Sequence, residues 1–421
     1  MARNKGKGGS KTADRAGVQF SLLGLIVFSV LLMGIGALVS YGFAASHLKA
    51  TRMVSSSDVG PAPTNLPPWG ELLVRDAELE QPEEYVAFEL QTNRVEQWTF
   101  AGMNPTQVRD LMSTCGLPSD EINHAAQLMK TTVSGVTIEP DDQLILSLAP
   151  SVRAKLYGKL SGDDANHYMK YPFCYPGKSL ENSLDENSMS KETIALIRKL
   201  CYPRGEAQCF SDYEFLLQHV PTDAARLSLV KALSRQTVAF VRLHIRPGTD
   251  IDRLLGYWGS AAGVRMKDTR PLLESVSRLE GGGNVSLLYL LPQFARQRLY
   301  TFPLPSTKAD DPAMDCHWST MNFFNETPDD RFSDSTYTTR YVLDHFYPVA
   351  KATYYGDIIF ILDEKGNAIH SAVYICDDII FTKNGNNFAQ PWALMHMKDL
   401  QARYANEESP TRMVAYRNKD R

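Results

Sequence analysis

The sequence lacks several features that would place a protein in a class at once. Its six cysteines among 421 residues are too few and too scattered for a disulfide-stapled miniprotein, and none lies in a CxxC pair of the kind that binds zinc. We therefore expect no metal ion and no other cofactor. Positive charge is not in excess, because the formal net charge is -4, whereas nucleic-acid binding depends on clustered Lys and Arg. Nucleic acid is therefore excluded as an expected partner.

Charged residues are also missing from one segment near the N-terminus. Residues 16–48 contain no Asp, Glu, Lys or Arg, and residues 20–39 are apolar and long enough to cross about 30 Å of hydrocarbon as a helix. Residues 1–17 carry five basic side chains and one acidic one, so the positive-inside rule keeps them cytoplasmic. We predict a cytoplasmic basic tail at 1–17 and one transmembrane helix at 18–45. The protein would be a single-pass protein of the inner, or cytoplasmic, membrane, with its C-terminal bulk in the periplasm.

A cleaved signal peptide is the alternative interpretation of this segment. Residues 43–46 contain small side chains that resemble a processing site. An apolar core longer than the usual ~7–15 residues favours a retained anchor instead. Both interpretations export the rest of the chain.

Composition divides the exported part into three regions. Residues 46–68 contain a serine run and spaced prolines without apolar periodicity, which is typical of a linker. Residues 69–299 are predicted to be mainly helical, and no catalytic spacing occurs there, so this region is interpreted as a scaffold or as a domain that restricts access. Apolar residues at three- and four-residue spacing predict helices at 105–115, 191–201, 212–219 and 222–242, and short strands are predicted at 85–90 and 143–148.

The C-terminal region, residues 300–421, carries the pattern that points to chemistry. A loop containing Asp310 and Asp311 leads into an expected helix that starts at or just after Cys316. A thiol at a helix N-terminus has its thiolate stabilised by the helix dipole and by unpaired N–H groups, as a nucleophile requires. Cys316 is therefore a candidate nucleophile.

Antiparallel β-hairpins are predicted after this helix. Gly356 and Asp357 form a turn before an apolar strand at 358–362, and further strands are expected at 369–375 and 379–383. The last two strands would be joined by a tight turn.

His370 shares a strand face with Ala372. The register of this last hairpin decides which residue of the next strand lies opposite His370. A three-residue loop at 376–378 would place Asn384 opposite the histidine. Another register would place Thr382 or Lys383 there.

The order of these elements, over about residues 300–400, resembles the NlpC-type papain-like cysteine peptidases and amidases, best known as bacterial cell-wall hydrolases. The shared features are Asp315-Cys316 opening a helix, Gly356-Asp357 before an apolar strand, and a histidine on the next strand. The resemblance implies that Cys316 attacks a peptide carbonyl and that His370 acts as general base and then as acid. A third polar residue orients the imidazole in this family, and that role falls on Thr382 by spacing or on Asn384 by the hairpin argument.

The sequence also departs from the family pattern. His317 and Trp318 follow the cysteine where the family often has Ser-Gly, and Tyr300 precedes it where the family often has a Tyr-x-Trp-Gly-Gly stretch. The substrate groove is therefore expected to differ.

Cysteine pairing stays open at two places. Outside the cytoplasm a disulfide can form between two of Cys174, Cys201 and Cys209, or between Cys316 and Cys376. Buried thiols are the alternative in both cases.

These observations together predict an α+β fold with a transmembrane helix, a mainly helical middle region and a papain-like C-terminal domain of helix plus antiparallel sheet. The predicted function is a membrane-anchored extracytoplasmic thiol hydrolase, a peptidase or amidase that acts on peptidoglycan peptides of a bacterial cell envelope. One alternative is a catalytically inactive protein that binds the envelope or a partner. Another is a latent hydrolase whose site the helical region covers. The true substrate and the oligomeric state are left open.

Overall fold

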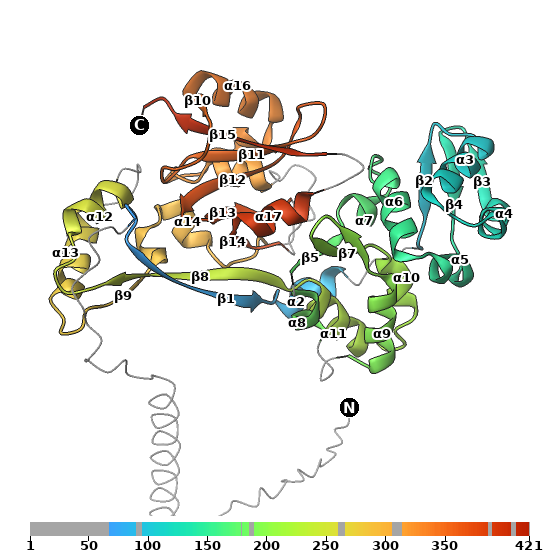
Figure 1. The fold of residues 1–421 in the computed structure, drawn as a ribbon, viewed down its shortest axis with the longest axis horizontal. Coiled ribbons are helices and arrows are strands. Elements are labelled where there is room, and N and C mark those ends of the chain that lie inside the picture. Colours follow the sequence, from blue (N-terminus) through green and yellow to red (C-terminus); the bar gives the residue numbers. More distant parts are fainter. Residues whose placement is uncertain are drawn as a thin grey trace, which may run out of the picture. The chain divides into compact units, whose positions relative to one another are not determined.

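The chain is an α+β protein in which helices surround antiparallel sheets, as the sequence predicts (Figure 1). The computed structural model describes residues 67–89, 95–177, 179–184, 189–259, 266–304, 314–385, 390–405 and 410–420. The predicted basic tail at 1–17, the predicted transmembrane helix at 18–45 and most of the predicted linker lie outside these residues. Within the described ranges, no helix has the length and hydropathy needed to span a bilayer.

The described residues between 69 and 299 form helices together with three small antiparallel sheets. The strands are β1 (Glu71–Leu79), β2 (Trp98–Ala101), β3 (Met129–Thr132), β4 (Gly135–Ile138), β5 (Phe173–Pro176), β6 (Tyr202–Arg204), β7 (Ala207–Phe210), β8 (Gln236–Ile245) and β9 (Gly283–Ser286). The first helices are α2 (Glu83–Glu89), α3 (Pro105–Cys115), α4 (Ser119–Gln127), α5 (Asp142–Ser147), α6 (Pro150–Leu160), α7 (His167–Lys170), α8 (Ser179–Ser183) and α9 (Lys191–Leu200). They are followed by α10 (Tyr213–Gln218), α11 (Asp223–Leu233), α12 (Ile251–Trp258), α13 (Met266–Ser277), η2 (Leu287–Leu290) and α14 (Gln293–Arg298).

Local capping signals explain the helices that the sequence predicts correctly. Helix α3 has the predicted bounds, because Asn104 caps it in a capping box with Gln107 and Gly116 ends it at a φ of 95°. Helices α9 and α10 lie within their predicted ranges.

Three element predictions in this region are wrong. The helix predicted at 222–242 ends at Leu233, and the chain continues as strand β8, because β8 pairs along its length with β1 from the start of the described chain. The strands predicted at 85–90 and 143–148 are helices α2 and α5. In α5 the Asp141 carboxylate accepts a bond from the Leu144 N–H at 3.0 Å, so an N-cap decides between helix and strand.

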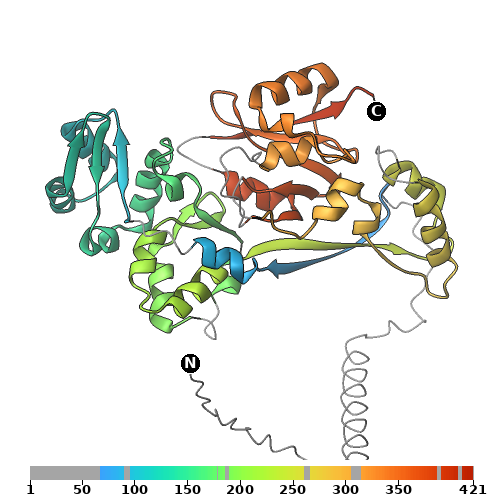
Figure 2. The ribbon, with the colours of Figure 1, turned by 180° about the vertical axis from the view of Figure 1, so that it is seen from behind.

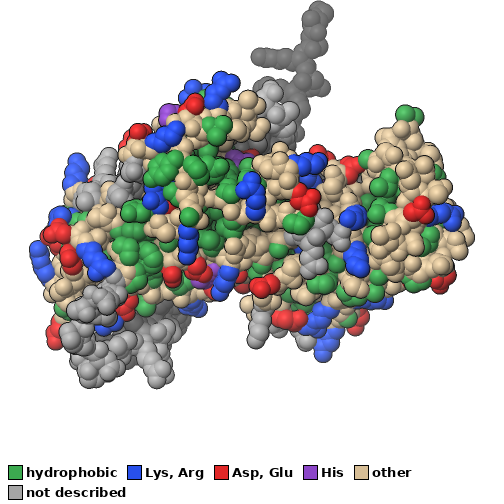
Figure 3. Space-filling view, turned by 45° about the horizontal axis from the view of Figure 1, so that its top comes forward, with side chains coloured by type: hydrophobic (Ala, Val, Ile, Leu, Met, Phe, Trp, Pro, Cys, Tyr) green, Lys and Arg blue, Asp and Glu red, His purple; other side chains and the backbone are tan. Residues whose placement is uncertain are grey.

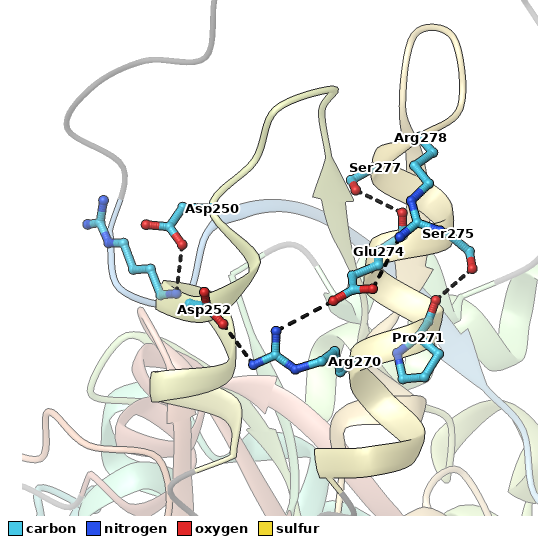
Figure 4. A network of polar contacts seen from close by, with 9 residues as sticks. Asp250, Asp252, Arg270, Pro271, Glu274, Ser275, Ser277 and Arg278 are labelled. Carbon is cyan, nitrogen blue, oxygen red and sulfur yellow. Dashed lines mark hydrogen bonds and ion pairs between the residues drawn. The ribbon is translucent and has the colours of Figure 1, made fainter.

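A long ribbon of β1 and β8 passes beside the C-terminal sheet (Figures 1 and 2). At one end it meets α12 and α13, and at the other it meets α2 and α11. A bond from Arg270 to Asp252 at 2.7 Å joins α13 to α12 (Figure 4). Along α13 itself, Arg270 reaches Glu274 at 3.5 Å, and Arg278, just after the helix, bonds to Glu274 at 3.3 Å. These groups are largely exposed, so each pair contributes only about 0–1 kcal/mol.

The C-terminal region is a six-stranded antiparallel sheet with helices packed on it, in the strand order β10-β15-β11-β12-β13-β14. Its elements are α15 (Cys316–Met321), η3 (Asp330–Ser333), α16 (Ser335–His345), β10 (Phe346–Val349), β11 (Ile358–Leu362), β12 (Ala368–Cys376), β13 (Ile379–Lys383), β14 (Trp392–His396), α17 (Met397–Tyr404) and β15 (Arg412–Asn418). The predicted helix at Cys316 and the predicted strands at 358–362, 369–375 and 379–383 are confirmed.

The hairpin loop between β12 and β13 is shorter than the predicted three-residue loop. Cys376 pairs with Ile379, so only Asp377 and Asp378 form the turn, and Asp377 has a φ of 54°. A β-bulge between Tyr374 and Cys376 absorbs the extra residue.

The hydrophobic core beneath this sheet extends across residue 300. It joins Trp318 of α15 and Phe381 of β13 to Leu243 of β8, Trp258 of α12 and Phe294 of α14, all of them buried. Residue 300 therefore does not mark a gap between two hydrophobic cores.

Candidate active site

Helix α15 presents Cys316 at its first position, against strand β12. The Asp315 carboxylate accepts a bond from the Trp318 N–H at 2.8 Å and so caps the helix. The Ser371 hydroxyl on β12 lies 3.1 Å from the Cys316 carbonyl oxygen. Because Ser371 follows His370 in the chain, this contact ties the start of the helix to the strand that carries the histidine. The thiol is buried, with Cys316 4% exposed.

The imidazole of His370 is fully buried and is oriented by Thr382 on the neighbouring strand. The distance from its Nε2 to the Thr382 Oγ1 is 2.8 Å, and that hydroxyl donates to the Ser371 carbonyl oxygen at 3.1 Å. A hydroxyl has one proton, so Thr382 accepts from the Nε2–H of His370. The neutral ring then carries its lone pair on Nδ1, which is buried and has no hydrogen-bond partner in the described part of the chain.

The two candidates for the third residue are placed differently. Val373 pairs with Phe381 and Tyr374 with Ile380, and the same register continued would bring Asn384 opposite His370. Strand β13 ends at Lys383, however, and the Asn384 amide lies 4.0 Å from a methionine sulfur, that of Met395. The imidazole reaches diagonally to Thr382 instead.

A second histidine, His317, lies beside the thiol. Its Nδ1 is 3.0 Å from the Ser371 Oγ, and its ring stacks near that of Phe360. Burial alone would lower the pKa of His317, but the negative charge of the Cys316 thiolate raises it to about 9. At neutral pH this imidazole is therefore charged.

The two histidines favour the thiolate form of the cysteine. Burial alone would raise the pKa of Cys316, but the positive charges of His370 and His317 hold this pKa well below its ordinary value. Lys383 is also buried in this part of the sheet, where burial lowers the pKa of its ammonium group to about 7, and its Nζ bonds to the Gly385 carbonyl oxygen at 2.8 Å.

His317 was not among the predicted site residues, because in the sequence it stands out only as a departure from the family pattern. Successive residues on a helix point about 100° apart, so adjacency to Cys316 in the chain does not predict a shared site. Only the packing of α15 on β12 brings both side chains to the same sheet.

A cavity of about 500 Å³ opens beside His317. Its walls come from α15, η3, α16, β11 and β15, and they include Phe332, Val342 and Phe360. Among the described residues that line it there is no Lys or Arg, and its charged side chains are His317 and Asp315, the cap of α15. With one positive and one acidic side chain in its wall and otherwise uncharged residues, the cavity suits a chain segment without net charge.

Helix α17 covers Cys316 and His370, the candidate catalytic dyad, on another side. The ring of Tyr404, the last residue of α17, lies 4.5 Å from the ring of His370 between centroids. The expected stand-in for the family tyrosine, Tyr300, is placed elsewhere: its hydroxyl donates to the Ala239 carbonyl oxygen at 2.6 Å, and its N–H donates to the Trp392 carbonyl oxygen at 2.7 Å. Tyr300 thus joins β8 to β14.

All six cysteines lie in the described ranges, and none forms a disulfide. Cys376 is buried in the sheet, and burial raises the pKa of its thiol. Among the residues that the structure describes, no three His, Cys, Asp or Glu side chains gather in a way that could hold a metal ion.

Comparisons with protein families, with curated proteins and with solved structures gave no match for this chain. The functional interpretation therefore depends on the geometry of the residues around Cys316.

Proposed function

We propose that this protein is a thiol hydrolase that cleaves amide bonds through Cys316, and that its C-terminal region is a papain-like domain of the NlpC type. One observation carries the proposal: the start of α15, with Cys316 at its first position, is bonded to strand β12 next to a buried histidine whose Nε2 is held by Thr382. A nucleophile, a base and a group that orients the base are the parts that covalent acyl transfer requires.

The reaction would proceed through a thioester. The Cys316 thiolate attacks the carbonyl carbon of the amide, and the C–N bond breaks while the His370 imidazolium gives its proton to the leaving amine. Water then attacks the thioester, with neutral His370 taking its proton at Nδ1, and the thiolate leaves. The charged His317 and the backbone N–H of Cys316 would stabilise the oxyanion that forms in each step.

The proposed substrates are peptides of the bacterial cell envelope. This part of the proposal rests on the predicted export of the chain through an inner-membrane anchor and on the family resemblance. The cavity that His317 lines, which has no Lys or Arg among its described lining residues, would receive the part of the peptide next to the scissile bond.

The test is release of peptides from purified cell wall by the protein under reducing conditions. We expect soluble amines and carboxylates to appear with the wild-type protein and to be absent with Cys316→Ala. His370→Ala should lower turnover by about 10²–10⁴-fold, as loss of a general acid–base does. Undiminished turnover of His370→Ala would remove the histidine from the mechanism.

Burial of the dyad favours a second candidate, a catalytically silent protein that binds the envelope. His370 is fully buried and Cys316 is 4% exposed. Alkylation by iodoacetamide at neutral pH, followed by peptide mapping, separates the two candidates. The hydrolase requires Cys316 to be labelled far faster than Cys376, a control thiol that is also buried.

We further propose that residues 69–299 hold α17 over the dyad, which would make the protein a latent hydrolase. Three contacts hold the end of this helix: Arg403 donates to the Gln236 Oε1 at 2.9 Å, Arg204 donates to the Ala405 carbonyl oxygen at 2.9 Å, and the Cys174 thiol lies 3.7 Å from the Arg403 carbonyl oxygen. Releasing them would let Tyr404 move away from His370.

A double variant tests this restraint. Arg204→Ala with Gln236→Ala should raise the turnover, or the labelling rate of Cys316, because α17 loses two of its hydrogen bonds. Arg242→Ala is the matched control, since this side chain is exposed on the same strand as Gln236. Rates equal to those of the wild type would discard the latent-hydrolase proposal.

A further inference from the structure

Two cysteines far from the candidate active site face each other across a pair of strands. Cys174 on β5 and Cys209 on β7 are direct antiparallel partners, and their sulfur atoms lie 2.7 Å apart. Both side chains are buried, with Cys174 6% and Cys209 0% exposed. Directly opposite side chains on antiparallel strands have Cβ atoms at about 4.5–5.5 Å, so a small approach brings them to the separation of about 3.5–4.5 Å in a disulfide.

The two thiols differ in access and in acidity. Cys174 lines a cavity of about 690 Å³, whose walls include Arg235, Lys398 and Arg403, whereas Cys209 does not line it. The hydrogen bond from Cys209 and the charges of Arg403 and Arg204 outweigh burial and lower the pKa of Cys174 to about 7. Burial raises the pKa of Cys209. Cys174 is therefore the thiol that a reagent in the cavity meets as a thiolate.

The third cysteine of this region is a poor partner for either thiol. Cys201 ends α9 and precedes β6, and the strand partner of Cys209 on that side is Tyr202. Burial raises the pKa of Cys201 to about 12. The choice among three cysteines that the sequence leaves open is thus narrowed to one pair.

We propose that Cys174 and Cys209 are a redox-active pair that forms a disulfide by exchange with an oxidant that itself carries a disulfide. The Cys174 thiolate attacks one sulfur of the oxidant, whose S–S bond breaks and releases one thiolate. Cys209 then gives up its proton and attacks the Cys174 sulfur of the mixed disulfide, expelling the second thiol. Two protein thiols are oxidised, and one disulfide of the oxidant is reduced to two thiols.

The disulfide would join β5 to β7, and β5 is the strand that faces α17. Disulfide formation would draw the Cys174 sulfur, which lies 3.7 Å from the Arg403 carbonyl oxygen, towards Cys209. Arg403 directly precedes Tyr404, the residue that covers His370. The redox state of Cys174 and Cys209 therefore acts on the contact between Cys174 and Arg403, one residue away from Tyr404. Formation of the disulfide itself does not depend on the proposed hydrolase activity.

Peptide mapping of the full chain tests the proposal. The protein is incubated with oxidised glutathione or with dithiothreitol, denatured in acid, alkylated with iodoacetamide and digested. After oxidation we expect the peptides of Cys174 and Cys209 to be joined and lighter by two hydrogens, and after reduction both thiols should be alkylated. Both thiols alkylated after oxidation, a lasting glutathione adduct on Cys174, or a bond from either thiol to Cys201 would each overturn the proposal.

Single variants assign the two roles. Cys209→Ser should leave a glutathione adduct on Cys174, because no resolving thiol is present, whereas Cys174→Ser should leave Cys209 unmodified. Cys201→Ser is the matched control and should still form the disulfide. A glutathione adduct on Cys209 in the Cys174→Ser protein would reverse the assignment. The wild-type map decides the main question even if a variant fails to fold.

Discussion

Replacing Thr382 by valine isolates the group that orients the candidate catalytic histidine. Valine keeps the β-branched shape of threonine on a buried strand, so the packing of β13 changes little, but it cannot accept a hydrogen bond from His370. The lost contact is the 2.8 Å bond between Nε2 and Oγ1. The Ser371 carbonyl oxygen also loses the donor that lies 3.1 Å away.

The expected magnitude follows from the state of the ring during the reaction. A neutral hydrogen bond contributes about 0.5–1.5 kcal/mol and one to a charged group about 1.5–3 kcal/mol. The imidazolium forms during acyl transfer, so the variant should lose about 10–100-fold in turnover, because each ~1.4 kcal/mol is tenfold. The loss should lie in kcat rather than in KM, because Thr382 holds the base and not the substrate.

Two further variants test whether the hydroxyl of Thr382, and not Asn384, orients the His370 ring. Thr382→Ser restores a hydroxyl and should recover most of the turnover. Asn384→Ala, which changes the other candidate for the third role, should leave turnover within about twofold of the wild type. The assay is release of peptides from purified cell wall, with the unfolding midpoint in urea measured for each protein. Wild-type turnover of Thr382→Val, or a larger loss in Asn384→Ala, would refute the orientation argument.

Three other predictions follow from charged groups. His317→Asn removes one of the two positive neighbours of Cys316, so the midpoint of its iodoacetamide labelling profile should move to higher pH; an unchanged midpoint would contradict the ion pair. The stability that the ion pair of Cys316 and His317 adds should rise with pH up to about 6.5, the ordinary histidine pKa. In this range the unfolded chain keeps the thiol proton that the folded protein has lost, because the thiolate forms only in the folded protein. This contribution should stay level to about pH 8.5 and fall as the pH passes the raised His317 pKa of about 9. The measurement is the unfolding free energy of the wild type minus that of His317→Asn at pH 5–10, which should follow this pH dependence. Arg153→Met leaves buried Asp212 without its ion partner and should cost about 3–5 kcal/mol in urea unfolding, whereas a loss below 1 kcal/mol would show that the pair adds little.

Local signals in the sequence determined the elements that carry the site. An acidic residue before Cys316 caps the helix, and the apolar runs around Gly366 and Asp377 specify the strands β11, β12 and β13, because capping and turn formation depend on residues a few positions apart. The same signals fail at 222–242, where helical periodicity continues into a segment that forms β8. That strand exists because β1, more than 150 residues earlier in the chain, supplies its hydrogen-bond partners.

Tertiary structure decided what surrounds the thiol. The hairpin register favours Asn384 as the residue opposite His370, but β13 ends at Lys383 and the imidazole reaches diagonally to Thr382, the candidate that the spacing gave. The packing of α15 on β12 added His317, and the docking of α17 added Tyr404. These contacts join residues that are distant in the chain, and their geometry depends on shifts of one residue in register. The sequence alone therefore determined Cys316, His370 and the elements that carry them, and the fold added the side chains around them and decided how they meet.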